Sequence, residues 1–363
     1  MASAEQAFII DLDSKTWIRP ENPGSYMNDG AQFADTFRTS TGDRHAFISG
    51  PNGVGRKDLG TLGGNLSVAA GINNAGQVVG YSTTAAGQYH AFATGPDGVG
   101  MIDLNPRNDY KSFASGINNS GQVVLYAAPD DDAFFHGLDI FITGPNGVGM
   151  TRTAILRGEN GRVGEINDAG QIIGNITARY PYHAFVSGPN GTNIIDLGTL
   201  LNTGAGEHAD YSSASGINNH GQVVGTSSAG YSGSEQHAFT TGPNGTELVD
   251  LGTLGGNYSY ANDINDAGQI VGSSDTEAGQ RHAFITSLDG TGMTDLNSLV
   301  ELPDGLILQN AVVINNQGQI LAHAIPEPEI YALLLVGLSL VGFLVRQKSR
   351  KRDQGWVFRD FHL

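Results

Sequence analysis

Apolar positions along most of this chain alternate with small or polar ones over short stretches, and turn-forming residues separate the stretches. Residues 71–81, GINNAGQVVGY, are one such unit. Asn tolerates a left-handed backbone and bonds its own main chain, and Gly adopts positive φ at no steric cost, so Asn73 to Gly76 predict a tight turn. The β-branched run at residues 77–81 predicts a strand after that turn.

This turn-and-strand unit occurs seven times, with one worn copy near the start. The apolar residue that leads into each turn lies at Met27, Ile72, Ile117, Ile166, Ile217, Ile264 and Ile314. The intervals between these positions are 45, 45, 49, 51, 47 and 50 residues. A period of this length indicates a repeat architecture, in which neighbouring units bury one another's apolar faces.

Three further strand patterns recur within each period. The first is His-Ala-Phe followed by a Gly-Pro-Asn-Gly turn with Pro at its first central position, and the second is an Asp-Leu stretch. The third is a Ser, Ala and aromatic run before each Ile-Asn turn, as at residues 67–72. The His-Ala-Phe copies begin at His45, His90, His183, His237 and His282, and the Asp-Leu copies at Asp58, Asp103, Asp196, Asp250 and Asp295.

Four short strands in each period are typical of a propeller blade. The sequence therefore predicts an all-β, seven-bladed β-propeller of about 45–50-residue, four-stranded repeats over residues 6–324, after a disordered start at residues 1–5. Six blades and an open β-solenoid are the alternatives. The chain opens with a His-Ala-Phe-like strand and an Asp-Leu strand, over residues 7–18, and closes with the other two strands of the repeat, over residues 308–323. Its two ends are therefore expected to share one blade.

Composition narrows the class of protein. The chain has 52 Gly among 363 residues and 15% charged residues, which suits an all-β fold with many turns. It has no Cys, and this excludes disulfides and Cys-based metal sites. The net charge is −17, and without the basic last eighteen residues the body carries about −21. A body this acidic argues against DNA or RNA as a partner.

Candidate metal sites are weak. The five His-Ala-Phe histidines should occupy equivalent places on a ring, whereas zinc ligands must converge to about 2.0–2.1 Å from one ion. The Ile-Asn turns lack the further acidic ligands of a calcium loop. The acidic stretch at residues 130–132 is the best isolated cation candidate, with a solvated loop as its alternative. We therefore predict structural histidines and turn-forming Asn and Asp, and no metal or cofactor.

No catalytic motif is recognisable. We find no paired carboxylates, no nucleophile elbow and no His-Glu metal spacing, and Gly53-Val54-Gly55 precedes no helix. The sequence thus predicts a non-enzymatic binding or scaffold module. The alternatives are a polysaccharide-active enzyme, a glycosidase or lyase, and a purely structural spacer without a ligand. An enzyme should break the repeat symmetry with acids from several blades at one mouth of the channel. A binding protein should spread aromatic or polar residues round one face.

These repeats resemble those of the HAF-repeat family of extracellular bacterial proteins. The resemblance rests on the His-Ala-Phe and Ile-Asn-x-x-Gly-Gln signatures and covers about residues 6–323. The third unit departs most from the pattern, with residues 130–132 and two Phe inserted before its worn strand. The resemblance implies an extracellular protein, and it implies little about chemistry.

The C-terminal segment has three parts. Pro326, Glu327 and Pro328 come first, and an apolar run of 16 residues follows at 330–345. As a helix this run spans about 24 Å, short of a bilayer core of about 30 Å. A basic cluster, expected on the cytoplasmic side, follows it. Its residues are Arg346, Lys348, Arg350, Lys351 and Arg352.

Residues 325–352 resemble a PEP-CTERM sorting signal, with Pro326-Glu327-Pro328 matching its Pro-Glu-Pro. The resemblance implies an exosortase-type sorting enzyme, transient anchoring in the inner membrane through residues 330–345, and release to the cell envelope or an exopolysaccharide matrix. An ordinary tail anchor is the alternative. Two features depart from an exported protein of this kind: the extension at residues 353–363, and a start that has a small-residue Ala2-Ser3-Ala4 pattern but no basic and apolar leader. Polysaccharide or another surface protein is the expected partner.

Overall fold

The structure of this protein is a computed structural model that describes residues 5–107, 110–129, 138–156, 162–176, 182–201, 210–229, 235–303 and 305–326. The acidic stretch 130–132, the residues Glu327 and Pro328, the apolar run 330–345 and the basic cluster lie outside these ranges. Within them the chain is built of strands, and the helical segments are six three-residue 3-10 turns.

In the described ranges the strands form seven antiparallel groups of four, and six of these groups consist of consecutive strands. Hydrogen bonds join them into three four-stranded and two eight-stranded sheets. Each eight-stranded sheet is two groups linked by one parallel residue pair, Arg44 with Leu66 or Gln236 with Tyr258. The first three groups are β3 (Tyr26–Met27), β4 (Phe33–Arg38), β5 (Arg44–Ile48) and β6 (Lys57–Asp58); β7 (Gly63–Ile72), β8 (Val78–Thr84), β9 (Tyr89–Gly95) and β10 (Val99–Asp103); and β11 (Tyr110–Ile117), β12 (Val123–Pro129), β13 (Leu138–Thr143) and β14 (Met150–Leu156).

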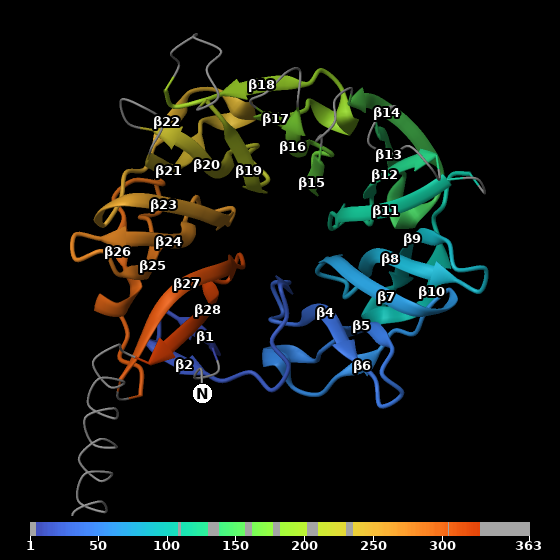
Figure 1. Cartoon of the computed structure of the whole chain (residues 1–363), viewed down its shortest axis with the longest axis horizontal. Helices are drawn as coiled ribbons and strands as arrows, with labels where there is room; N and C mark the ends of the chain where they lie inside the picture. Colours follow the sequence, from blue (N-terminus) through green and yellow to red (C-terminus); the bar gives the residue numbers. More distant parts are fainter. Residues whose placement is uncertain are drawn as a thin grey trace, which may run out of the picture.

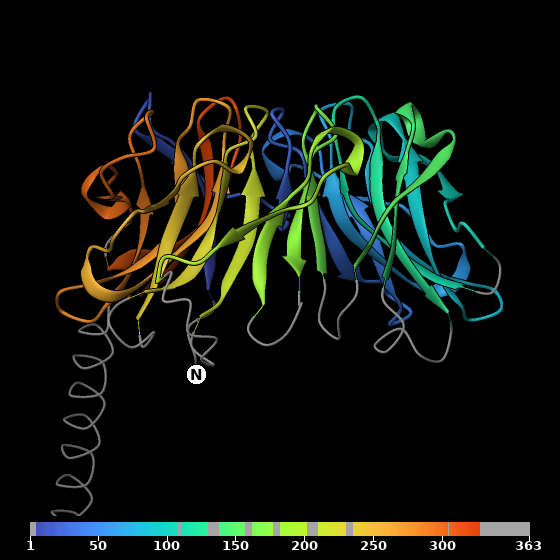
Figure 2. The ribbon, with the colours of Figure 1, turned by 90° about the horizontal axis from the view of Figure 1, so that it is seen from above.

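The next three groups repeat the same order. They are β15 (Arg162–Ile166), β16 (Ile172–Ile176), β17 (His183–Val186) and β18 (Ile195–Gly198); β19 (Ser212–Ile217), β20 (Val223–Ala229), β21 (Glu235–Thr241) and β22 (Leu248–Asp250); and β23 (Gly255–Ile264), β24 (Ile270–Thr276), β25 (Arg281–Ile285) and β26 (Thr294–Asp295). Figure 1 shows the groups following one another round a circle, each with its first strand toward the centre. Figure 2 shows this ring from its edge, with strands running from one face to the other.

The last group contains both ends of the described chain. It pairs β27 (Leu306–Ile314) and β28 (Gln319–Pro326) with β1 (Gln6–Asp11) and β2 (Thr16–Ile18). β1 lies antiparallel to β28, with Gln6 opposite Ala324 and Asp11 opposite Gln319. This confirms the prediction that the chain ends share one sheet, and it excludes an open solenoid. β28 extends to Pro326, two residues past the predicted end of the repeats.

Each Ile-Asn turn forms as its sequence predicts. Gly76 has φ 70° and its N–H donates to the carbonyl oxygen of Asn73 at 3.0 Å, while the Asn73 N–H donates to Gln77 at 3.1 Å. The left-handed Asn conformation occurs instead at the Gly-Pro-Asn-Gly turns, for example at Asn52 with φ 57°. Asn73 stabilises its turn through hydrogen bonds of its side chain instead.

The hydrophobic core is divided into clusters that lie between neighbouring groups. One cluster joins Ala46 and Ile48 of β5 to Val78 of β8 and Phe92 of β9. Phe92 is the phenylalanine of a His-Ala-Phe pattern and is fully buried. Each group therefore buries its apolar face against the next, which is the physical reason for the repeat.

None of the helical turns in the described ranges has the length and apolar character needed to cross a membrane.

Candidate functional site

The first strands of the groups and the turns after them surround a central cavity of about 330 Å³. All seven groups contribute to its lining. Equivalent residues of the seven units therefore form rings round the cavity, one ring for each position of the repeat.

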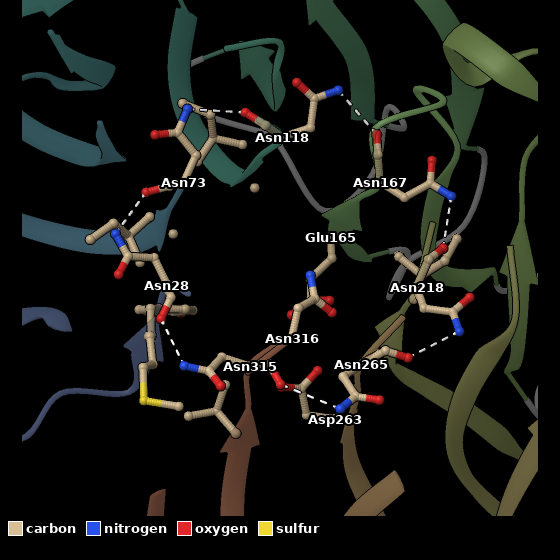
Figure 3. Close-up of a pocket in the computed structure, with 18 of the residues that line it drawn as sticks. Asn28, Asn73, Asn118, Glu165, Asn167, Asn218, Asp263, Asn265, Asn315 and Asn316 are labelled. Atoms are coloured by element: carbon tan, nitrogen blue, oxygen red, sulfur yellow. Dashed lines mark hydrogen bonds between the residues drawn. The ribbon is translucent and has the colours of Figure 1, made fainter. Parts of the chain in front are cut away.

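The first asparagine of each turn forms a closed hydrogen-bonded ring, shown in Figure 3. Each side-chain Nδ2 donates to the backbone carbonyl of the next asparagine at 3.0–3.3 Å, and Asn315 returns to Asn28. We call this set the asparagine ring: Asn28, Asn73, Asn118, Asn167, Asn218, Asn265 and Asn315. The ring ties the two ends of the repeat array together at the centre.

The geometry of one copy explains why the residue is asparagine. The Oδ1 of Asn73 accepts the N–H groups of Ala75 and Gln77 at 3.1 and 3.0 Å. Its Nδ2 donates to Gln77 Oε1 at 2.8 Å and to the Asn118 carbonyl at 3.1 Å. One amide thus closes its own turn and reaches the next unit, although Asn73 is only 3% exposed. Among the uncharged side chains, only an amide supplies two donors and a strong acceptor.

The next position forms a second ring on the solvent side, which we call the rim. Each rim backbone N–H donates to the side-chain Oδ1 of the following rim residue at 2.8–3.0 Å, and Asn316 closes the circle on Asp29. Its members are Asp29, Asn74, Asn119, Asp168, Asn219, Asp266 and Asn316. These side-chain oxygens serve the protein's own N–H groups, which accounts for the Asn and Asp at the rim without a calcium ion.

A third ring, the wall, is formed by the residue before each apolar lead residue. Its members are Tyr26, Gly71, Gly116, Glu165, Gly216, Asp263 and Val313, and all of them except Gly216 line the cavity. The neighbouring first strands approach closely here, since a Cβ added to Gly116 would lie 3.2 Å from the Cα of Glu165. Unlike the asparagine ring, the wall carries different residues in different units.

Two wall residues are acids that enter the same cavity from different groups. The carboxylate of Asp263 accepts the N–H of Ile264 at 2.8 Å and that of Ile314 at 2.9 Å. Glu165 takes a hydrogen bond from the N–H of Ile217. Each acid therefore binds the backbone of the following unit.

Both acids hold their protons more tightly than usual. Burial, together with the negative charge of Asp263, raises the pKa of Glu165 to about 8, although the hydrogen bond from Ile217 opposes the rise. Burial raises the pKa of Asp263 to about 7, against the hydrogen bonds from Ile314 and Ile264. Two carboxyl groups with raised pKa values in one cavity have the chemistry of a general acid or base.

This pair of acids was not recognisable from the sequence, because Glu165 and Asp263 lie far apart along the chain. Aligning the seven copies would have revealed them, since three wall positions carry Gly and two carry an acid.

Aromatic side chains gather farther along the strands, away from the turns. Phe113 stacks on Tyr126 with ring centroids 5.2 Å apart and on Tyr89 at 6.0 Å, and Tyr81 meets Phe113 edge-on at 5.1 Å. Tyr81 lies three residues beyond the start of β8, about 10 Å from the turn. We call Tyr81, Tyr89, Phe113 and Tyr126 the aromatic quartet. All four are partly exposed, and two adjacent groups supply them.

The five His-Ala-Phe histidines do not converge. Each Nδ1 bonds at 2.6–3.0 Å to an Asp of its own group, thirteen residues later in the chain. The Asp also accepts a nearby N–H, as Asp58 does from Gly60 at 2.8 Å. The bond to Asp196 raises the pKa of His183, and the same bond lowers the pKa of Asp196. This fits the predicted structural role, and the constant spacing of thirteen was its signal in the sequence.

Over the described ranges, no three His, Cys, Asp or Glu side chains are grouped so as to hold a metal ion.

Neither a protein-family model nor a curated protein matches this chain. Among solved structures, the β-propeller domain of the Trilobed protease from Pyrococcus furiosus is similar, with a TM-score of 0.52 over 80% of this chain and 86% of that chain at 11% identity. The chain folds as a β-propeller. Oligogalacturonate lyase from Vibrio parahaemolyticus aligns over 91% of this propeller and 98% of its own chain, at 8% identity and a TM-score of 0.50.

TolB from Acinetobacter baumannii also aligns, at 11% identity and over 82% of this propeller. This chain spans 64% of that TolB chain, and the TM-score of 0.45 is too low to support an argument. At such identities the likenesses concern the fold alone.

Proposed function

We propose that this protein is an exported, non-enzymatic binding or scaffold module of the cell envelope or extracellular matrix, and that its seven groups are the seven blades of one propeller. The aromatic quartet carries the proposal. Its partly exposed rings come from two adjacent groups, which is the distribution expected of a binding face rather than of a core. Polysaccharide is the proposed ligand, because stacked rings present flat apolar faces to sugar rings.

The sugar ligand is tested with the full chain on a panel of neutral, acidic and amine-bearing oligosaccharides. Replacing Phe113 by Ala removes the ring that contacts the other three and should weaken binding about tenfold. Phe37→Ala is the matched control, because Phe37 is a partly exposed aromatic residue outside the quartet. Absence of binding to every oligosaccharide would contradict the proposed ligand.

The route of export is proposed from the tail alone. Pro326-Glu327-Pro328, the apolar run 330–345 and the basic cluster occur in the order of a sorting signal. The test follows the mass of the protein in fractions of its native host, with and without the sorting enzyme. Loss of residues 330–345 only when the enzyme is present would support exosortase-type processing, and a product that always keeps them would contradict it.

One observation favours a second candidate, a polysaccharide-active enzyme. Glu165 and Asp263 break the repeat symmetry inside the cavity, and a raised pKa suits a general acid. The test is release of new reducing ends, or of unsaturated products, from the same oligosaccharides. Turnover that is lost in Glu165→Gln and Asp263→Asn would establish the enzyme and refute the binding module.

A further inference from the structure

The backbone of the lead residues supplies hydrogen-bond donors to the cavity. Val78 lies opposite Ile72 and turns its own N–H outward, to Thr94 Oγ1 at 2.8 Å. Residues opposite each other in an antiparallel pair alternate between bonded and non-bonded, so Ile72 and Val78 are a non-bonded pair. The N–H of Ile72 therefore points away from β8, into the cavity that Ile72 lines.

The same relation holds in five other groups. In each, the residue opposite the lead residue donates to a hydroxyl at the end of the third strand or directly after it. The donors are Phe33, Val123, Ile172, Val223 and Ile270, with Ser49, Thr143, Ser187, Thr241 and Thr286 as acceptors. A ring of lead-residue N–H groups consequently faces the cavity.

The wall residues divide the ring of lead-residue N–H groups into an acidic side and a glycine side. On one side, the carboxylates of Glu165 and Asp263 take up the N–H groups of Ile217, Ile264 and Ile314. On the other side, Gly71 and Gly116 place no side chain beside the ring. The cavity thus offers acceptors on one side and backbone donors on the other.

On the glycine side, Ser115 adds a hydroxyl group that has no hydrogen-bond partner among the described residues. Ser115 lines the cavity, and its Oγ is buried. A buried hydroxyl without a partner costs free energy, and a ligand that bonds it recovers that cost.

Charge narrows the class of ligand. Among the described residues, five acids and no Lys, Arg or His line the cavity. An anion would meet the uncompensated negative charge of the three rim acids, Asp29, Asp168 and Asp266. The ring of N–H donors in turn disfavours a bare metal ion. A sugar hydroxyl satisfies both sides, because it donates to a carboxyl oxygen, whether or not the acid is protonated, and accepts from an N–H. The cavity volume of about 330 Å³ is at the lower end for small-molecule sites, roughly 300–1,000 Å³.

We propose that the central cavity binds the terminal sugar residue of a neutral polysaccharide, with Glu165 and Asp263 as hydroxyl acceptors and the lead-residue N–H groups with Ser115 as the opposite side of the site. This inference rests on the proposed polysaccharide ligand. It adds the central cavity to the aromatic quartet as a binding site, and it specifies a neutral sugar.

The test titrates the full chain with neutral hexose oligosaccharides, and with oligogalacturonate and chitosan oligosaccharides as the acidic and cationic arms. Glu165→Leu keeps a side chain of similar size without an acceptor and should weaken neutral binding about tenfold or more. Glu165→Gln keeps a carbonyl acceptor and should change it less than about threefold. Glu277→Leu, at an exposed acid outside the cavity, should change nothing.

Asp263→Gly provides a second variant if Glu165→Leu does not fold, because Gly already occupies the wall in three other units. It too should weaken neutral binding. Stronger binding of the acidic or cationic arm overturns the inference, as does neutral binding that Glu165→Leu and Asp263→Gly leave intact. If Phe113→Ala weakens binding and the cavity variants do not, the cavity inference fails while the proposed function stands. If no arm binds, both fail.

Discussion

The asparagine ring and the wall surround the same cavity, two residues apart in each repeat, and they behave in opposite ways. The asparagine ring has the same residue in all seven units, whereas the wall has Tyr, Gly, Glu, Asp and Val. Each asparagine makes bonds that the next unit needs, so no member can change alone. The wall residues are not joined in such a chain of side-chain bonds, so single units can differ. A position that carries the same residue in all seven units therefore has a structural role. A position that differs between units is where a ligand can be recognised.

Breaking the asparagine ring should give the largest effect. Asn73→Ala removes four hydrogen bonds from a buried site and leaves donors and acceptors unsatisfied, so we expect a loss of about 3 kcal/mol or more in the free energy of unfolding. The adjacent rim variant Asn74→Ala is the control. Asn74 is exposed, and its loss should cost about 1 kcal/mol or less. Urea unfolding measures both. Equal losses would contradict the distinction between ring and rim.

Adding a side chain at a wall glycine should give the second-largest loss of stability. A Cβ on Gly116 would lie 3.2 Å from the Cα of Glu165 and 3.3 Å from the N of Ile166, and backbone atoms cannot move aside cheaply. Gly116→Ala should therefore cost about 1–3 kcal/mol. Gly30→Ala is the control, because its nearest contact is 3.4 Å and its φ is ordinary. If the two variants melt at the same temperature, close approach does not explain the glycine in the wall.

The wall acids should make stability depend on pH. The pKa of Glu165 rises from 4.5 to about 8 on folding, so between these values the folded state holds more protons than the unfolded chain. Stability should be greatest below the lower value and should fall as the pH rises through about 8. We expect the melting temperature to drop by a few degrees between pH 5 and 8.5. Glu165→Gln should flatten this slope, and Glu277→Gln should leave it unchanged. The raised pKa of Asp263 contributes a slope of the same sign, so only a slope that is undiminished in Glu165→Gln would show that Glu165 is not a source.

Restoring the glycine that the first copy of the turn lacks should stabilise the protein slightly. Ala31 occupies the position that carries Gly in the other six turns, and it has φ 51°. A left-handed backbone costs a residue with a Cβ about 1–2 kcal/mol, so Ala31→Gly should stabilise the protein by about 1 kcal/mol. Ala75→Gly, made outside the left-handed region, should destabilise it slightly. Thermal unfolding of the two variants measures the difference, and a loss of stability in Ala31→Gly would refute the explanation.

Much of the fold was predictable because it depends on local patterns repeated many times. Turn residues such as Gly76 and strands such as His-Ala-Phe recur at a fixed period, and the phase of the first and last strands predicted the shared sheet. Asn73 was recognised as a turn residue, but its reach to Asn118 was not, because that bond joins residues 45 positions apart. The functions of the tail remain predictions from residues 326–352.

The sequence by itself determined the repeat, its all-β character and the closure of its ends, since these follow from periodicity and from the preferences of Gly, Asn and β-branched residues. Only the tertiary structure decided which residues share the cavity. Ring closure brings Glu165 and Asp263, from two different groups, into one space. No local pattern encodes that meeting, because it depends on how seven units pack round a common axis.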